Sequence, residues 1–167
     1  DVDTAVAAAR SAFEKGPWSS FLPAQRARCL RKLGDLLEQQ VDELATVQVL
    51  ENGKLIREVL GQTKGLAQHC YYFAGMAESM HGHTVSISVP EMFNYTIREP
   101  IGVVGAVTPW NSPLSLLIWK LCPALAAGNT MVVKPSEVTP VSTLVLAELF
   151  EQAGFPPGVI NVIVGDG

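Results

Sequence analysis

The sequence predicts an α/β fold in which a helical segment and a two-stranded antiparallel ribbon precede a parallel β-α-β-α-β unit. Residues 1–83 repeat apolar side chains at helical spacing, whereas residues 84–99 alternate between apolar and polar side chains. Over residues 100–167, short apolar runs alternate with longer helical patterns, which is typical of parallel strands buried on both faces. We therefore divide the chain into these three parts.

Turn-forming residues divide the first part into four predicted helices. Asp3 can cap the first helix, which the Gly-Pro pair at 16–17 stops. Pro23 opens the second helix, and the Asn-Gly pair at 52–53 ends the third. The fourth carries an apolar stripe over residues 56–77, which predicts that it packs on a larger body.

The hydrophobic period changes to two in the ribbon. Apolar residues alternate with serine over residues 85–89 and with other polar residues over 93–98. These runs predict antiparallel strands joined through residues 90–92. Because a two-stranded ribbon is marginally stable alone, we expect it to extend a sheet formed by further sequence or by another subunit.

The third part predicts a Rossmann-like parallel, doubly wound sheet with right-handed crossovers. Strands are expected over residues 101–107, 130–134 and 159–164, because each run is apolar on both faces. The Ser-Pro pair at 112–113 is typical of the start of one connecting helix, and the Thr-Pro pair at 139–140 of the start of a second.

Composition excludes several classes of function. The 167 residues, 48% of them hydrophobic and 17% charged, suffice for one domain with a sizeable core. A net charge of -4, with acidic and basic residues interspersed, offers no surface for nucleic acid and no polybasic membrane anchor. The longest apolar stretch, residues 114–127, is interrupted by Lys120 and Pro123, so we expect no membrane span.

Other sequence features are expected to be structural. The three cysteines have no C-x-x-C spacing, which favours a reducing, cytoplasmic compartment. The His-Gly-His sequence at 81–83 lacks a third ligand and is interpreted as a turn, so no metal site is expected. The chain stops at residues 165–167 in what should be the middle of a fold, and we expect both true termini to be missing. Small buried side chains, and not nucleophiles, are expected at Cys29, Cys70 and Cys122.

Candidate binding residues follow the predicted parallel strands, because ligands of open parallel sheets bind beyond the carboxyl ends of the strands. Residues 108–111 supply a tryptophan plane and an asparagine amide, which can donate a hydrogen bond to a carbonyl oxygen as it gains charge. Residues 134–137 supply a lysine and a glutamate three apart, suited to the hydroxyls of a ribose. Residues 165–167 supply glycine, where a backbone can pass close to a ligand.

Each of these segments also has a purely structural interpretation. Trp110 and Asn111 are more usually a packed tryptophan and a helix-capping amide at such a junction. Lys134 and Glu137 are equally typical of a surface ion pair. The G-x-G at 165–167 is short, and no complete G-x-G-x-x-G occurs in the chain.

Several motifs follow one another after residue 98. They are Glu-Pro-Ile-Gly-Val-Val-Gly at 99–105, Thr-Pro-Trp-Asn-Ser-Pro at 108–113, Pro-Ala-Leu-Ala-Ala-Gly-Asn-Thr at 123–130, Lys-Pro-Ser-Glu-Val-Thr-Pro at 134–140 and Ala-Gly-Phe-Pro-Pro-Gly-Val-Ile-Asn-Val at 153–162. In order and spacing they resemble the NAD(P)-dependent aldehyde dehydrogenase superfamily. The resemblance covers essentially the whole chain and identifies it as the N-terminal portion of such a protein.

The resemblance implies that residues 1–83 and 100–167 form part of a cofactor-binding domain, the latter being the first half of its core, and that the ribbon at 84–99 bridges subunits. It implies NAD as cofactor, because the carboxylate of Glu137 would hold both ribose hydroxyls and repel a 2′-phosphate, although some members use NADP. It assigns catalysis to Asn111, as donor to the oxyanion, and to Lys120, near the active-site floor. It assigns cofactor binding to Thr108, Pro109, Trp110, Asn111, Lys134, Ser136, Glu137 and Gly167.

The implied reaction is the oxidation of a small-molecule aldehyde to a carboxylic acid through a cysteine thiohemiacetal and thioester. The family's nucleophilic cysteine and general-base glutamate lie downstream of residue 167, so this chain alone is predicted to be inactive. The family also implies a homodimer or homotetramer. The main alternative is a non-catalytic nucleotide-binding or structural fragment of the same family, while a flavodoxin-like binding domain would leave the linked motifs unexplained.

Overall fold

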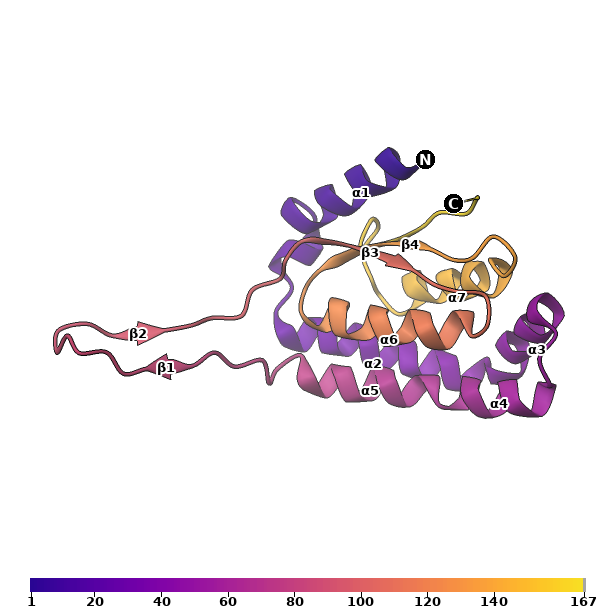
Figure 1. Ribbon diagram of the computed structural model, residues 1–167, viewed down its shortest axis with the longest axis horizontal. Helices are drawn as coiled ribbons and strands as arrows, with labels where there is room; N and C mark the ends of the chain where they lie inside the picture. Colours follow the sequence, from indigo (N-terminus) through magenta and orange to yellow (C-terminus); the bar gives the residue numbers. More distant parts are fainter. Residues whose placement is uncertain (167) are drawn as a thin grey trace.

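The predicted order of elements recurs in the computed structural model, which describes residues 1–166 (Figure 1). The helical part contains α1 (Val2–Glu14), the short 3-10 helix η1 (Pro17–Ser20), α2 (Pro23–Gln39), α3 (Val41–Asn52), α4 (Ile56–Lys64) and α5 (Leu66–Met76). The ribbon contains β1 (Thr84–Val85) and β2 (Asn94–Tyr95). The parallel unit contains β3 (Val103–Val107), α6 (Pro113–Ala126), β4 (Thr130–Lys134), α7 (Val141–Gln152) and β5 (Ile160–Val162).

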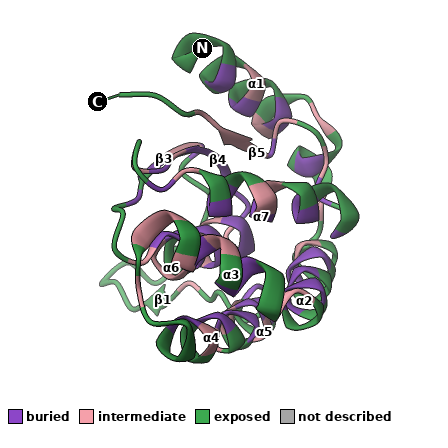
Figure 2. Cartoon of the chain, turned by 90° about the vertical axis from the view of Figure 1, so that its right-hand side faces the viewer, coloured by how far each residue is buried: buried purple, intermediate pink, exposed green. Residues whose placement is uncertain are grey.

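The parallel sheet has the strand order β3-β4-β5, with β4 in the centre. Val103 pairs with Thr130 at the start of β3, and Val107 pairs with Lys134 at its end. Helices cover both faces of this sheet, with α6 and α7 on one side and α1 on the other (Figure 2). The predicted α/β architecture is therefore confirmed, and the central strand is buried except at Lys134.

A second helical layer lies beneath α6. Helices α2 and α5 run side by side and pack against it (Figure 1). Each fully buried leucine contributes roughly 1.5–3 kcal/mol to stability, so the packing between these layers is a major source of it. The fully buried large side chains include Leu30, Leu33 and Leu37 of α2, Leu66 of α5, and Leu114, Leu117, Leu121 and Leu125 of α6.

Two details predicted for the helical part were wrong. The helix expected over residues 56–77 is two helices, because the N–H of Gly65 donates to Gln62 O, three residues back, at 3.1 Å. This tightened turn interrupts the α-helical hydrogen bonds. At the N-terminus the capping position of α1 belongs to Asp1, while Asp3 lies in the first turn, where a carboxylate still stabilises the helix.

The ribbon is antiparallel, as predicted, but its paired region is shorter than expected. Thr84 pairs with Tyr95 and Val85 with Asn94. Residues 83–101 are exposed, and Figure 1 shows the ribbon projecting from the body. A hairpin that projects into solvent lacks the third strand or apolar support that would extend its pairing.

Side chains of the helical part bind the turn between α6 and β4. The indole N–H of Trp18 donates to the carbonyl oxygens of Gly128 and Asn129, both at 3.1 Å. The guanidinium of Arg26 donates to Ala126 O at 3.1 Å, where a cation also complements the C-terminal end of α6. These contacts join the helical part to the parallel unit.

Asn129 links this turn to the first strand. Its Oδ1 accepts a hydrogen bond from the N–H of Gly102 at 3.0 Å, and its Nδ2 donates to Ala124 O at 3.1 Å. The next residue, Thr130, donates its N–H to Gly102 O at 3.1 Å and its hydroxyl to Ala9 O of α1 at 3.0 Å. The start of β4 is thereby held against both β3 and α1.

Substitution Asn129→Ala is expected to destabilise the chain by roughly 2 kcal/mol, because it leaves the buried N–H of Gly102 without an acceptor. Urea denaturation followed by circular dichroism measures the change. Asn129→Asp, which retains an acceptor oxygen, should cost less, and Asn94→Ala in the exposed ribbon should cost almost nothing. Equal stabilities for Asn129→Ala and Asn94→Ala would contradict the assigned role.

Candidate functional site

A depression opens where β3 and β4 end. Because Val107 pairs with Lys134, and the N–H of Thr108 donates to Lys134 O at 3.1 Å, the two strands end at the same edge of the sheet. Beyond this point the loops leading to α6 and α7 diverge and enclose a volume of ≈ 590 Å³. We call it the strand-end cleft; it is lined by Val107, Thr108, Pro109, Lys134, Pro135, Ser136 and Glu137.

The polar groups of the strand-end cleft are weakly engaged by the protein. The buried hydroxyl of Thr108 has no hydrogen-bond partner within residues 1–166. Lys134 Nζ donates to the neighbouring Pro135 O at 3.4 Å, and Ser136 Oγ donates to Glu137 Oε2 at 3.4 Å. Bonds of this length are weak, so a cation, a hydroxyl and a carboxylate remain available to a ligand.

Trp110 and Asn111 lie on the loop that continues from the cleft into α6. Trp110 is 55% exposed, so it is not packed against the residues described. The N-cap position of α6 belongs to Ser112, so Asn111 is not the capping residue. Asn111 is exposed, and it lies two residues after Pro109, which lines the cleft.

The surface ion pair considered for Lys134 and Glu137 is also absent. Among the residues described, the charged side chains that lie within 4.0 Å of each other are those of Arg10 and Glu14 on α1, and not those of Lys134 and Glu137. The lysine and the glutamate line the same cleft without neutralising each other. They therefore present opposite charges to whatever occupies it.

Two predicted site residues stand apart from this group. Lys120 is exposed on α6, does not line the strand-end cleft, and donates from Nζ to Leu116 O of its own helix at 3.3 Å. Gly167 lies outside the described residues. The structure thus brings together five of the predicted residues, Thr108, Pro109, Lys134, Ser136 and Glu137, with Trp110 and Asn111 following on the same loop.

The cysteines are buried, as predicted. Cys70 Sγ and Cys122 Sγ lie 3.5 Å apart in the core. Their hydrogen bond and then burial raise the pKa of Cys122 well above its usual value, and burial raises the pKa of Cys29. Thiols held in the protonated form are poor nucleophiles, so these side chains belong to the core and not to a reactive site.

The described residues contain no candidate metal site and no candidate membrane-spanning helix. Residues 1–166 contain no group of three or more histidine, cysteine, aspartate or glutamate side chains placed to bind a metal ion. None of their helices combines the length and the apolar composition that crossing a bilayer requires.

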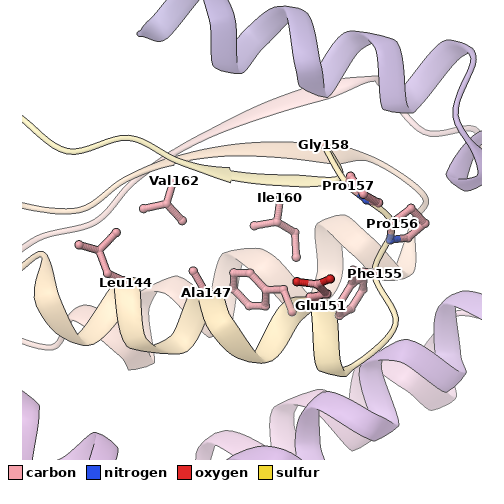
Figure 3. Close-up of a pocket in the computed structure, with 10 residues that line it drawn as sticks. Leu144, Ala147, Glu151, Phe155, Pro156, Pro157, Gly158, Ile160 and Val162 are labelled. Carbon is pink, nitrogen blue, oxygen red and sulfur yellow. The ribbon is translucent and has the colours of Figure 1, made fainter.

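A second pocket lies between α7 and the outer strand β5 (Figure 3). It encloses ≈ 430 Å³ and is lined mainly by apolar side chains, among them Leu144, Phe155 and Ile160. Its single titratable group is the carboxylate of Glu151. The pocket shares no lining residue with the strand-end cleft, and its lining offers no convergent set of polar groups for catalysis.

Two residues that contact the ends of the loops of the strand-end cleft were not predicted to have a role. Glu51 accepts hydrogen bonds at the start of α7, and Lys54 donates one to Ser112 at the start of α6. Both lie around the Asn-Gly pair at 52–53, which was interpreted only as a helix stop. Glu51 lies 90 residues from Val141, and Lys54 lies 58 residues from Ser112, so no local pattern indicated these contacts.

Many known proteins resemble this chain, and three of them illustrate the likeness. Aldehyde dehydrogenase 1A1 of Mus musculus is 48% identical over 169 residues, covering 100% of this chain and 34% of the mouse protein. The NAD+ complex of aldehyde dehydrogenase from Bacillus cereus matches with a TM-score of 0.97 and 46% identity, covering 100% of this chain and 34% of that one. NAD-dependent aldehyde dehydrogenase from Sinorhizobium meliloti matches with a TM-score of 0.96 and 41% identity, covering 100% and 33%.

The chain therefore spans about a third of the length of the relatives it matches. Within that third, fold and sequence agree from end to end, and the model of the aldehyde dehydrogenase family matches residues 1–167. The chain belongs to the aldehyde dehydrogenase family.

Proposed function

We propose that this chain is the N-terminal portion of an NAD-dependent enzyme that oxidises an aldehyde to a carboxylic acid. The observation that carries the proposal is the strand-end cleft, in which Lys134, Ser136 and Glu137 present unneutralised polar groups at the carboxyl edge of a parallel sheet. Family membership and the NAD+ complex of a matched relative support the choice of reaction and cofactor.

The residues of the strand-end cleft fit a dinucleotide. Lys134 and Glu137 would bind the adenosine ribose, with Ser136 and Gly167 toward the adenosine end. Thr108, whose buried hydroxyl has no protein partner, and the neighbouring Pro109 and Trp110 would line the cleft. Bound NAD would accept a hydride from the substrate carbon. The carboxylate of Glu137 would repel the 2′-phosphate of NADP, which favours NAD, with NADP as the weaker alternative.

Asn111 would supply the amide that donates to the carbonyl oxygen as negative charge develops there. Its exposed position beside the cleft supports this role. Lys120, whose Nζ donates to Leu116 O, would lie near the active-site floor. The nucleophilic cysteine and the general-base glutamate would come from chain beyond residue 167, and the 167 residues alone would be inactive. The second candidate, a non-catalytic nucleotide-binding fragment, predicts cofactor binding without turnover.

The three parts of the chain have different proposed roles. Residues 1–83 and 100–167 share one hydrophobic core, which supports their assignment to one cofactor-binding domain. Residues 84–99 project from it and expose apolar side chains, which supports a bridging role between subunits of a homodimer or homotetramer.

Substitution Asn111→Ala in the full-length protein is expected to lower kcat for aldehyde oxidation roughly 100-fold or more, since one oxyanion donor is lost. NADH formation with a panel of aldehydes measures the rate. Gln152→Ala removes an exposed amide at the end of α7 and should leave the rate unchanged. A wild-type protein that binds NAD without oxidising any aldehyde would favour the second candidate.

Substitution Glu137→Gln is expected to raise the ratio of kcat/KM for NADP to that for NAD about tenfold, because it removes the charge that repels the 2′-phosphate. Steady-state kinetics with each cofactor give the ratio. Glu148→Gln, on the exposed face of α7, serves as the matched control. An unchanged ratio would remove Glu137 from the ribose site.

Substitution of both Phe93 and Ile97 by lysine is expected to lower the oligomeric state of the full-length protein. These side chains are 76% and 63% exposed on the ribbon, and charge there opposes burial in an interface. Native mass spectrometry reports the state. Leu50→Lys alters a side chain that is 82% exposed on α3 and should have no effect. An unaltered oligomer would contradict the bridging role of the ribbon.

A further inference from the structure

Glu51, in the last turn of α3, holds the beginning of α7. Its carboxylate accepts the N–H of Val141 at 2.8 Å, the N–H of Ser142 at 3.2 Å and the hydroxyl of Ser142. The N-cap residue of α7 is Pro140, whose side chain cannot accept a hydrogen bond. The capping group therefore comes from another helix, and it fixes the end of the loop that carries Ser136 and Glu137.

Lys54, just past the end of α3, holds the beginning of α6. Its Nζ donates to Ser112 Oγ at 3.1 Å and to Gln62 Oε1 at 3.1 Å. Ser112 is the N-cap residue of α6 and follows Asn111 directly. The ammonium therefore stands beside the segment that carries the proposed oxyanion donor.

The two anchoring residues belong to one short segment. Gly53 turns the chain in the left-handed region at φ 72°, and its N–H donates to Val49 O at 2.9 Å. Asn52 Oδ1 accepts the N–H of Lys54 at 3.0 Å. We call residues 51–54 the α3–α4 corner; these bonds fix Glu51 and Lys54 relative to each other.

Helix stability explains the contact of Glu51 but not that of Lys54. A carboxylate at the N-terminal end of α7 is favourable, because the helix dipole is positive there. A cation at the N-terminal end of α6 is unfavourable for the same reason. Lys54 does place positive charge next to Ser112, the residue that follows the proposed oxyanion donor Asn111.

We propose that the α3–α4 corner is a positioning element of the active site, which holds the two loops of the strand-end cleft at a fixed separation. Glu51 positions the ribose-binding loop, and Lys54 positions the loop of Asn111 and adds positive charge beside it. The inference rests on the proposed function and names two residues outside the cleft on which that function depends.

In the full-length protein, Glu51→Ala is expected to raise KM and the dissociation constant for NAD about tenfold, with kcat changed less than twofold, because the ribose-binding loop loses its anchor. Glu51→Gln keeps one acceptor oxygen and should restore part of the affinity. The control is Gln25→Ala, which removes the side-chain acceptor at the N-terminus of α2, where Gln25 Oε1 accepts the N–H of Leu22 at 2.8 Å. It should leave NAD binding unchanged.

Lys54→Met is expected to lower kcat roughly tenfold while KM for NAD stays within twofold. The reason is that Lys54 contacts Ser112, beside Asn111, and not the ribose-binding loop. Lys54→Arg should restore most of the rate by keeping the charge and a donor. Lys32→Met, on the exposed face of α2, is the matched control.

Amide hydrogen exchange provides a readout that does not require activity. Glu51→Ala should accelerate exchange at the amide positions within residues 136–142, and Gln25→Ala should not. Unchanged exchange and NAD affinity in Glu51→Ala, or equal losses in Gln25→Ala, would overturn the inference while leaving the proposed function intact. A wild-type protein without aldehyde oxidation would overturn the proposed function, and the exchange result would still decide whether the corner anchors the loop.

Discussion

The register between β3 and β4 is the constraint on which the rest of the structure depends. It is set at one end of the sheet, where Asn129 and Thr130 bond to Gly102, and it is used at the other end, where Val107 meets Lys134. A slip of one residue would turn every side chain of β4 to the opposite face. The composition of the strand-end cleft therefore follows from hydrogen bonds made at the far end of the strands.

That register depends in turn on the helical part of the chain. Trp18 and Arg26 bind the carbonyl oxygens at the end of α6, and α1 contributes Ala9 O as acceptor for Thr130. An isolated β-α-β-α-β unit would leave these groups to water and expose the apolar surface that α2 and α5 cover. The first 83 residues therefore help to determine the shape of the strand-end cleft, although none of them lines it.

Contacts with the helical part also hold the loops of the strand-end cleft. Each of its loops begins at a paired strand and ends at a helix whose start is tied to the α3–α4 corner. Loops anchored at both ends lose little further entropy when they bind a ligand. Opposite charges at Lys134 and Glu137 remain unneutralised between these anchors, in a position suited to the polar part of a dinucleotide.

The sequence by itself determined the elements and their order, because hydrophobic period, prolines and glycines act locally: the bounds of β4 and the start of α6 at Ser112 and Pro113 agree with the prediction. It also placed Thr108, Lys134, Ser136 and Glu137 at strand ends, where parallel topology brings them together. Only the tertiary structure decided the short pairing of the ribbon, the exposure of Trp110 and the contacts of Glu51 and Lys54. These features depend on which surfaces meet and which stay in solvent, and no local pattern in the chain records that.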